Sequence, residues 1–193
     1  MFISIEGPDC SGKSAVVKEL RLKFPEAIFV REPGTTLFGE RIREILLNSS
    51  HNLEPISELL LFTSSFCETS SKVIMPALKE GKLVIADRWY FSTIAYQCYA
   101  TSRNKEYHLM HDLMKMDGIS KPMVNFILTA PWDVLKKRMA MRSGAKDNFE
   151  KRDESYQRKI YEYYNSVCVG EKISTDCNIE ETLSSILSKI KKY

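Results

Sequence analysis

Residues 7–14 form a Gly-x-x-x-x-Gly-Lys-Ser loop, a pattern whose residue types suit phosphate binding. The loop reads Gly7-Pro8-Asp9-Cys10-Ser11-Gly12-Lys13-Ser14. Its glycines let the backbone curl so that successive N–H groups converge on an anion, and the dipole of the following helix adds to this field. Lys13 can then reach the β- and γ-phosphates of a nucleotide, and Ser14 can offer its hydroxyl to Mg²⁺.

The residues around this loop predict a strand before it and a helix after it. The apolar run Phe2-Ile3-Ser4-Ile5 suits a buried strand over 2–6 that leads directly into the loop. Apolar side chains recur on one side of the helix expected at about 13–23, namely Val16, Val17, Leu20 and Phe24. Strand, glycine loop and helix in this order are the context in which the pattern binds phosphate, so we interpret 7–14 as a nucleotide-binding loop.

Asp87 and Arg88 stand at the end of a second apolar run, residues 83–87. The carboxyl ends of parallel strands border the ligand crevice of an α/β sheet, so both side chains are expected there. A carboxylate beside a phosphate loop can hold Mg²⁺ directly or through water, and a guanidinium can bind phosphoryl oxygens through two parallel hydrogen bonds. A plainer interpretation is also open, in which Asp87 caps the next helix and Arg88 faces solvent.

A run of cations surrounds Gly144, between Lys136 and Lys146. By default such a run is a solvated helix face. In a phosphotransferase it can serve instead as a lid that excludes water and brings guanidinium groups onto the transferring phosphoryl group. We predict a lid over about 142–150, with Arg138 and Arg142 as its active cations.

Four side chains are candidates for contacting a nucleobase. Phe62 and Phe66 lie four residues apart on an expected helix, where such pairs usually belong to the core, although a ring face can also stack on a base. Tyr96 and Gln97 follow Asp87-Arg88 on the next helix, and the Gln97 amide can pair with a base edge. Core packing and base binding both remain open for these residues.

The elements that position these residues alternate along the chain. Strands that are apolar over their whole length, separated by helices, indicate a parallel sheet covered on both faces, which is the doubly wound α/β class. We expect strands at 2–6, 27–31, 83–87, 124–129 and, more weakly marked, 172–175. Helices are expected at about 13–23, 37–48, 56–80, 92–103, 105–117, 132–142, 150–168 and 179–192. Pro76 should kink or break the long helix at 56–80.

The bulk properties limit the class of protein. A chain of 193 residues suits one domain, here 1–193, with a full hydrophobic core. It has 28 Lys and Arg against 25 Asp and Glu, and without a basic arm this formal charge of +3 gives no indication of nucleic-acid binding. Neither a signal peptide nor a membrane span is visible. Five cysteines without metal-ligand spacing indicate a reduced, cytoplasmic protein.

These motifs together resemble the thymidylate kinase family, in order and at that family's spacing. The stretches that carry the resemblance are Glu6 to Ser14, Arg31 to Thr36, Gly39 to Arg43, Asp87-Arg88-Trp89, Ser92 to Gln97 and Asp147 to Glu150. They cover essentially the whole chain. The resemblance implies a P-loop kinase fold with a lid and a homodimer. It also implies Mg²⁺-assisted transfer of the γ-phosphate of ATP to dTMP, which forms dTDP for dTTP synthesis.

The resemblance also implies roles for single residues. Residues 7–14 correspond to the ATP site, with Ser14 and Asp87 at the Mg²⁺ ion. At the acceptor nucleotide, Asp9 corresponds to the acid near the sugar 3′-hydroxyl, and Arg43 and Arg88 correspond to the arginines that hold the phosphate. Phe62 corresponds to the ring that stacks on thymine, and Gln97 and Ser92 correspond to polar contacts near the base edge. Tyr96 corresponds to the tyrosine that crowds the sugar and disfavours a 2′-hydroxyl. Because the acceptor is already an anionic phosphate, cations and not a strong general base must do the work.

Two departures from the family's pattern matter. Cys10 stands where one branch of the family has an arginine, so the catalytic arginine is expected from the lid, as in bacterial-type members. Phe66 stands where the family has an arginine that reads the thymine ring, so base reading is expected to rest on Gln97, stacking and shape. This predicts relaxed selectivity and leaves open a kinase for dUMP or a 5-modified dUMP.

Three other functions are weighed against this interpretation. A deoxynucleoside kinase needs a carboxylate base near the end of the first strand, and it would leave the acceptor arginines without a partner. A nucleotide-binding module without turnover is opposed by the joint presence of Lys13, Ser14, Asp87, Arg88 and two lid arginines. A guanine-nucleotide switch is opposed by the segment Asn104-Lys105-Glu106-Tyr107, which lacks the aspartate that reads guanine.

Overall fold

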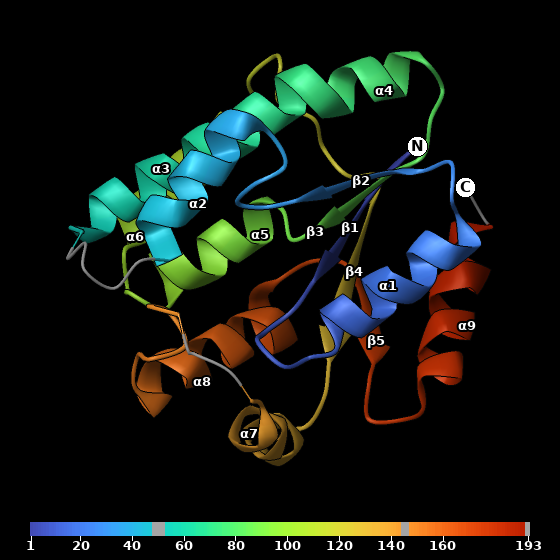
Figure 1. Ribbon diagram of the computed structural model, residues 1–193. Helices are drawn as coiled ribbons and strands as arrows, with labels where there is room; N and C mark the ends of the chain where they lie inside the picture. The colour runs from blue at the N-terminus through green and yellow to red at the C-terminus, as the bar shows by residue number, and fades with distance from the viewer. Residues whose placement is uncertain (48–52, 144–146, 192–193) are drawn as a thin grey trace.

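The computed structural model describes residues 1–47, 53–143 and 147–191, and over these ranges five strands form one parallel sheet (Figure 1). The strands are β1 (Phe2–Glu6), β2 (Ile28–Arg31), β3 (Val84–Asp87), β4 (Val124–Thr129) and β5 (Glu171–Ser174). Their order across the sheet is β2-β3-β1-β4-β5, and each neighbouring pair is parallel. The predicted α/β class is confirmed, including the weakly marked fifth strand.

Helices cover both faces of this sheet, and successive residues of β1 point to opposite faces. Ile3 and Ile5 pack with α1 (Lys13–Lys23) and α9 (Ile179–Ile190) on one face, whereas Phe2 packs into the larger core of the other face. The remaining helices are α2 (Leu37–Leu47), α3 (Pro55–Thr69), α4 (Met75–Lys79), α5 (Tyr90–Thr93), α6 (Asn104–Leu113), α7 (Trp132–Met141) and α8 (Glu154–Glu162). In the part of the chain that the structure describes, no helix is long and apolar enough to cross a membrane.

Three π-helical segments interrupt the expected helices: η1 (Ser70–Ile74), η2 (Ile94–Tyr99) and η3 (Tyr163–Val167). The first explains why Pro76 does not break the long helix. A proline has no N–H to donate, and its ring collides with the carbonyl four residues earlier in an α-helix. In η1 the Met75 N–H bonds five residues back, to the Ser70 carbonyl. This wider turn lets the chain continue into α4, which ends at Lys79, and Gly81 follows with a φ of 74°.

The pairing of β1 with β3 brings the two chemically important strand ends together. Ile5 lies opposite Asp87 in this parallel pair, and the Arg88 N–H donates to the Ile5 carbonyl at 3.0 Å. The loop that follows β1 and the Asp87-Arg88 pair that follows β3 therefore emerge side by side at the carboxyl edge of the sheet, where α/β folds bind ligands.

Candidate active site

The glycine loop lies between β1 and α1, and both of its glycines are required by its shape. Gly7 has a φ of 142°, and a Cβ at this position would be 2.4 Å from the Leu128 carbonyl oxygen of β4. Gly12 has a φ of 90° directly before the first turn of α1. Both conformations favour glycine. The loop thus curls in front of the N-terminus of α1, where backbone N–H groups attract anions.

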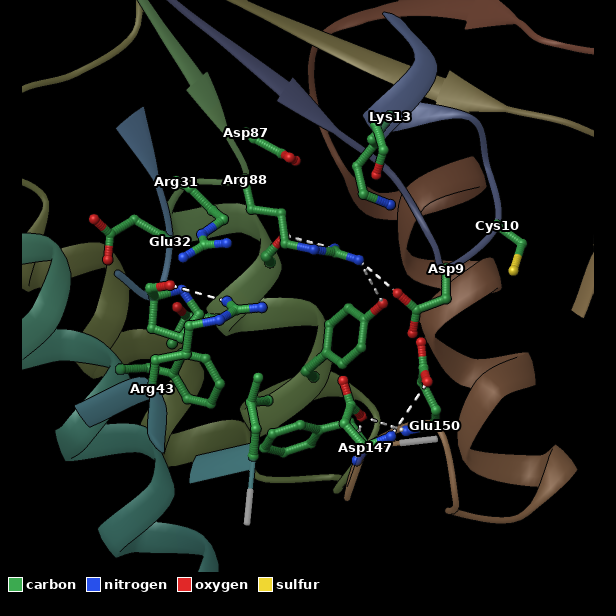
Figure 2. A pocket seen from close by; sticks show the side chains of 18 of the residues that line it. Asp9, Cys10, Lys13, Arg31, Glu32, Arg43, Asp87, Arg88, Asp147 and Glu150 are labelled. Carbon is green, nitrogen blue, oxygen red and sulfur yellow. Dashed lines mark hydrogen bonds and ion pairs between the residues drawn. The ribbon is translucent and has the colours of Figure 1, made fainter. Parts of the chain in front are cut away.

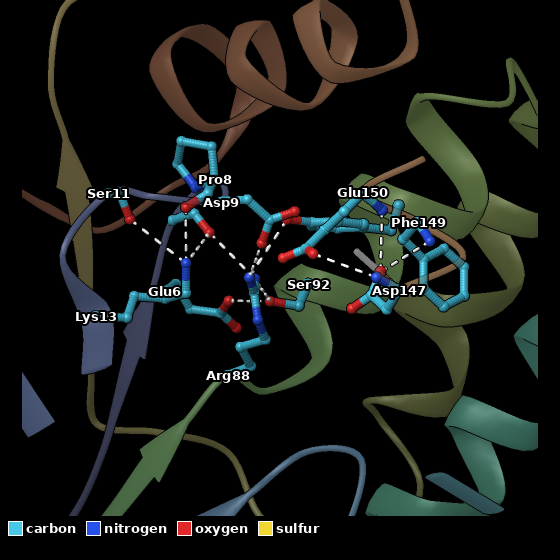
Figure 3. Close-up of polar contacts among 12 residues, drawn as sticks. Glu6, Pro8, Asp9, Ser11, Lys13, Arg88, Ser92, Asp147, Phe149 and Glu150 are labelled. Atoms are coloured by element: carbon cyan, nitrogen blue, oxygen red, sulfur yellow. Dashed lines mark hydrogen bonds and ion pairs between the residues drawn. The ribbon is translucent and has the colours of Figure 1, made fainter. Parts of the chain in front are cut away.

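Lys13 lies inside this loop and is almost fully buried. Its Nζ donates to the carbonyl oxygens of Gly7 at 3.0 Å and Pro8 at 2.7 Å (Figure 3). Burial lowers the pKa of Lys13 to about 8, and the nearby Arg88 acts in the same direction, whereas the acids around it oppose this shift. At neutral pH the loop therefore holds a protonated lysine.

Arg88 is held over the same loop from the β3 side. Its Nη2 donates to Asp9 Oδ1 at 2.5 Å and to the Tyr96 hydroxyl at 3.3 Å, while its Nη1 donates to the Gly7 carbonyl and to Ser92 Oγ, both at 3.1 Å (Figures 2 and 3). Burial raises the pKa of Asp9, but Arg88 and Lys13 outweigh it and bring this pKa below its usual value. The carboxylate of Asp9 and the guanidinium of Arg88 are therefore both charged.

Three guanidinium groups gather on one wall of the cavity, as Figure 2 shows for Arg31, Arg43 and Arg88. Arg43 Nη1 donates to the Pro33 carbonyl at 3.0 Å, and Arg31 pairs with Glu40 at 2.7 Å. Burial lowers the pKa of Arg43, and the charges of Arg31 and Arg88 lower it further. Because these like charges repel one another, the wall favours an anion such as a phosphate.

Aromatic rings surround the other end of the cavity. Phe62 of α3 faces Phe149 with ring centroids 5.6 Å apart, and Tyr96 lies 6.4 Å from the same ring. Gln97 also lines this cavity and is 1% exposed, yet neither of its amide atoms has a hydrogen-bond partner among the residues that the structure describes. Buried amides that lack a partner are costly, so this one is prepared to bind a polar ligand edge between rings.

Phe66 does not line the cavity, contrary to the expectation that it replaces a base-reading arginine. The side chain is 1% exposed and packs in the core against Trp89, with ring centroids 5.6 Å apart. It lies one turn beyond Phe62 on α3, and its phenyl ring fills the apolar surface that Trp89 offers in the same core. The core interpretation that the sequence left open is the correct one for Phe66, whereas Phe62 reaches the cavity.

The two expected lid arginines have different surroundings. Arg138 Nη2 donates to the Thr175 carbonyl at 2.6 Å, and its Nη1 to Thr175 Oγ1 at 3.2 Å and to the Cys10 carbonyl at 3.5 Å. Arg138 therefore ties the glycine loop to the end of β5. Arg142 is half-exposed and forms an ion pair with Glu150. Residues 144–146 of the expected lid, Lys146 among them, lie outside the described residues.

The residues of the sequence prediction converge on one cavity of about 610 Å³. Those that line it are Asp9, Cys10, Gly12, Lys13, Ser14, Arg43, Phe62, Asp87, Arg88, Ser92, Tyr96, Gln97, Arg138 and Arg142. Gly7, Pro8 and Ser11 shape the loop behind it. The Ser92 hydroxyl is already engaged, because it donates to Glu6 at 2.7 Å and accepts from Arg88.

Phe149 and Glu32 are among the cavity residues to which the sequence analysis gave no individual role, although both lie in stretches that carry the family resemblance. Phe149 reaches it because Asp147 Oδ1 accepts the N–H groups of Phe149 and Glu150, both at 2.9 Å, and so fixes a turn. The one sign of this role in the sequence is that Phe149 is a single phenyl ring in a charged stretch. Glu32 follows β2 and is nearly buried, and burial raises its pKa to about 7. Its place after an apolar strand, as for Asp87, was the available signal.

Comparison with known proteins finds one consistent family. The family profile described as thymidylate kinase matches residues 5–186. The thymidylate kinase of Wolbachia pipientis from Culex pipiens is 39% identical over 185 residues, covering 93% of this chain and 85% of that protein. That of Kosmotoga olearia is 39% identical over 168 residues, covering 85% and 80%.

Solved structures agree on the fold. The thymidylate kinase from Candida albicans superposes with a TM-score of 0.81 at 23% identity, covering 99% of this chain and 91% of that one. The enzyme from Ehrlichia chaffeensis gives a TM-score of 0.73 at 24% identity, covering 99% and 98%. At these identities the likeness shows a shared fold.

Proposed function

The chain belongs to the thymidylate kinase family, whose members transfer a phosphoryl group from ATP to dTMP, and from this premise we propose how the residues of the cavity share that reaction. The ATP phosphates bind residues 7–14 at the N-terminus of α1. Lys13 supplies the cation at the β- and γ-phosphates, where charge builds up as the phosphoryl group moves.

The dTMP phosphate binds the wall formed by Arg31, Arg43 and Arg88. The observation that carries this assignment is the crowding of these three guanidinium groups next to the glycine loop. An acceptor phosphate there lies beside the donor phosphates and relieves the repulsion among the arginines. Holding the two reactants in this way supplies most of what phosphoryl transfer needs, because the acceptor is already an anion.

Thymine binds between the rings of Phe62 and Tyr96, with its polar edge on the Gln97 amide. The Gln97 oxygen can accept from N3–H while its nitrogen donates to a ring carbonyl, which satisfies both unpartnered atoms. Asp9, held by Arg88, lies toward the sugar. Nothing in the site favours dUMP over dTMP, because the motive for that alternative was a Phe66 ring at the base and this ring lies in the core.

Ser14 and Asp87 are the residues that would hold Mg²⁺. Both line the cavity, and the Asp87 carboxylate forms no hydrogen bond or ion pair with any residue that the structure describes. Hydroxyl and carboxylate oxygens suit Mg²⁺, which keeps waters and substrate phosphates among its ligands. When bound, the ion neutralises charge on the ATP phosphates. Asp87 and Ser14 therefore fit the ion by the chemistry of their oxygens.

The base assignment is tested by replacing Gln97 with leucine. The variant should lower kcat/KM for dTMP at least about tenfold, mainly through KM, because the ring edge loses its partners. The KM for ATP should stay within about twofold. Phe66→Leu is the matched control, since a buried residue one turn from Phe62 should leave the ratio of kcat/KM for dTMP and dUMP unchanged. If Gln97→Leu keeps kcat/KM for dTMP within about twofold of the parent, or if Phe66→Leu lowers it as much as Gln97→Leu does, the assignment is wrong.

Replacing the two lid arginines, Arg138 and Arg142, should have different kinetic effects. Arg142→Ala should lower kcat about tenfold or more while leaving dTMP affinity unchanged. The half-exposed Arg142 guanidinium can leave its ion pair with Glu150 and bind the transferring phosphoryl group instead. Arg138→Ala should chiefly raise the KM for ATP, because the glycine loop loses its tie to Thr175. Steady-state kinetics on both variants measure this. Full kcat in the double variant contradicts a catalytic lid.

Three further features belong to the same proposal. Exposed apolar side chains on α2 and α3, including Phe38 and Leu60, supply a surface through which two copies of this chain form a homodimer. We also propose that the reaction takes place in the cytoplasm. One folded domain with its lid performs the whole reaction.

A further inference from the structure

Glu6, at the end of β1, is a buried acid for which the reaction just described has no use. It is 0% exposed and does not line the cavity. Its strand neighbour Ile5 points into the core with α1, whereas Glu6 points to the other face, toward the chain that follows β3. A buried carboxylate is costly unless its oxygens are hydrogen-bonded, so its partners show what it does.

The three partners of Glu6 come from two separate parts of the chain, the segment after β3 and η3. Oε1 accepts the Trp89 backbone N–H at 2.9 Å. Oε2 accepts from Ser92 Oγ at 2.7 Å and from the Tyr164 hydroxyl of η3 at 3.1 Å. Burial raises the pKa of Glu6, while these hydrogen bonds and the charge of Arg88 lower it. One carboxylate thus joins the ends of β1 and β3 to the C-terminal third of the chain.

Two of these bonds, from Trp89 and Ser92, act on the turn that carries Arg88. Its backbone has a φ of 67°, which is uncommon for a residue with a Cβ and persists only where the surroundings determine it. The Arg88 N–H is fixed on the Ile5 carbonyl, and the next N–H, of Trp89, is fixed on Glu6. The Ser92 hydroxyl that donates to Glu6 accepts from Arg88 Nη1 at 3.1 Å (Figure 3).

We propose that Glu6 is a positioning residue for the acceptor phosphate: it fixes the backbone turn and the Ser92 hydroxyl that together aim Arg88 across the glycine loop. Asp9, and not Glu6, makes the direct ion pair with Arg88. The proposal rests on the role proposed above for Arg88 in binding dTMP.

Glu6→Gln is the variant that tests it. The substitution keeps an acceptor for the Trp89 N–H but places an NH₂ group where Ser92 and Tyr164 donate. Isothermal titration calorimetry should show at least about tenfold weaker dTMP binding and ATP binding within about threefold of the parent. Tyr164→Phe is the milder comparison: it removes a hydroxyl that contacts both Glu6 and, at 2.9 Å, Ser92 Oγ. It leaves Glu6 bonded to the Trp89 N–H and to Ser92, and Ser92 bonded to Arg88, so it should change dTMP affinity by less than about threefold.

A double-mutant cycle with Arg88→Met separates positioning from general destabilisation. If Glu6 acts through Arg88, adding Glu6→Gln to Arg88→Met should weaken dTMP binding by less than about twofold more. A merely structural role predicts the full loss in both backgrounds. Should Glu6→Gln fail to fold in thermal melts, Ser92→Ala replaces it in the cycle. Ser92→Ala should weaken dTMP binding at least about threefold when introduced into the parent protein, and should leave it unchanged when introduced into Arg88→Met.

The outcomes distinguish the two proposals. Unchanged dTMP affinity in Arg88→Met overturns the role of Arg88, and with it this inference. Weakened affinity in Arg88→Met together with parental affinity in Glu6→Gln overturns the role of Glu6 alone. Equal losses from Glu6→Gln with and without Arg88 do the same.

Discussion

Lys13→Ala should lower kcat by at least about 100-fold, with a smaller change in the KM for ATP. The variant removes a buried cation that faces the β- and γ-phosphates of the proposed complex. Charge on these oxygens is greatest as the phosphoryl group transfers, so the lost interaction is stronger in the transition state than in bound ATP. Initial rates of ADP formation at saturating ATP and dTMP measure the effect.

Lys18→Ala is the control for Lys13→Ala. Lys18 lies on the same helix but is exposed to solvent, so its loss should leave kcat within about twofold of the parent. If Lys13→Ala also turns over dTMP within about twofold of the parent, the assignment of the glycine loop to ATP is wrong.

Arg88→Met should lower kcat/KM for dTMP about 1000-fold, which corresponds to about 4 kcal/mol. Two effects combine. The acceptor phosphate loses a guanidinium, and Asp9 is left as a buried carboxylate without its ion pair beside the phosphate site. Kinetics at varied dTMP and saturating ATP should show both a higher KM and a lower kcat.

Arg41→Met is the control for this variant. Arg41 lies on α2 near Arg43, but its side chain is 71% exposed and pairs with Glu44 on the surface, so its loss should have little effect on dTMP. A kcat/KM for Arg88→Met within about tenfold of the parent contradicts the proposed acceptor site.

The parts of this protein that local sequence determines could be predicted. Four of the strands are short apolar runs with clear boundaries, whereas β5 has one apolar residue and was only weakly marked. The glycine loop has a fixed spacing between a strand and a helix. The π-helical turns could not be predicted, because an N–H that bonds five residues back leaves no pattern in apolar spacing. Pro76 predicts a kink or a break in the long helix. In the structure the π-helical turn η1 avoids the proline's clash without ending the helix.

The site shows the same division. Loop 7–14 and the pair Asp87-Arg88 were predictable, because parallel strands end at one edge. Phe62 and Phe66 look alike in the sequence, and only the position of Trp89 decides that Phe66 lies in the core. Phe149 reaches the cavity from a turn 87 residues away from Phe62, and no local pattern reports such a contact.

Incubation of the purified protein with Mg²⁺, dTMP and ATP labelled at the γ-phosphate is the most direct measurement of the proposed reaction. We predict labelled dTDP in amounts equal to the ADP formed, and only background ADP when dTMP is omitted. ADP that forms at the same rate without dTMP, or label that passes to another nucleoside monophosphate but not to dTMP, would contradict it.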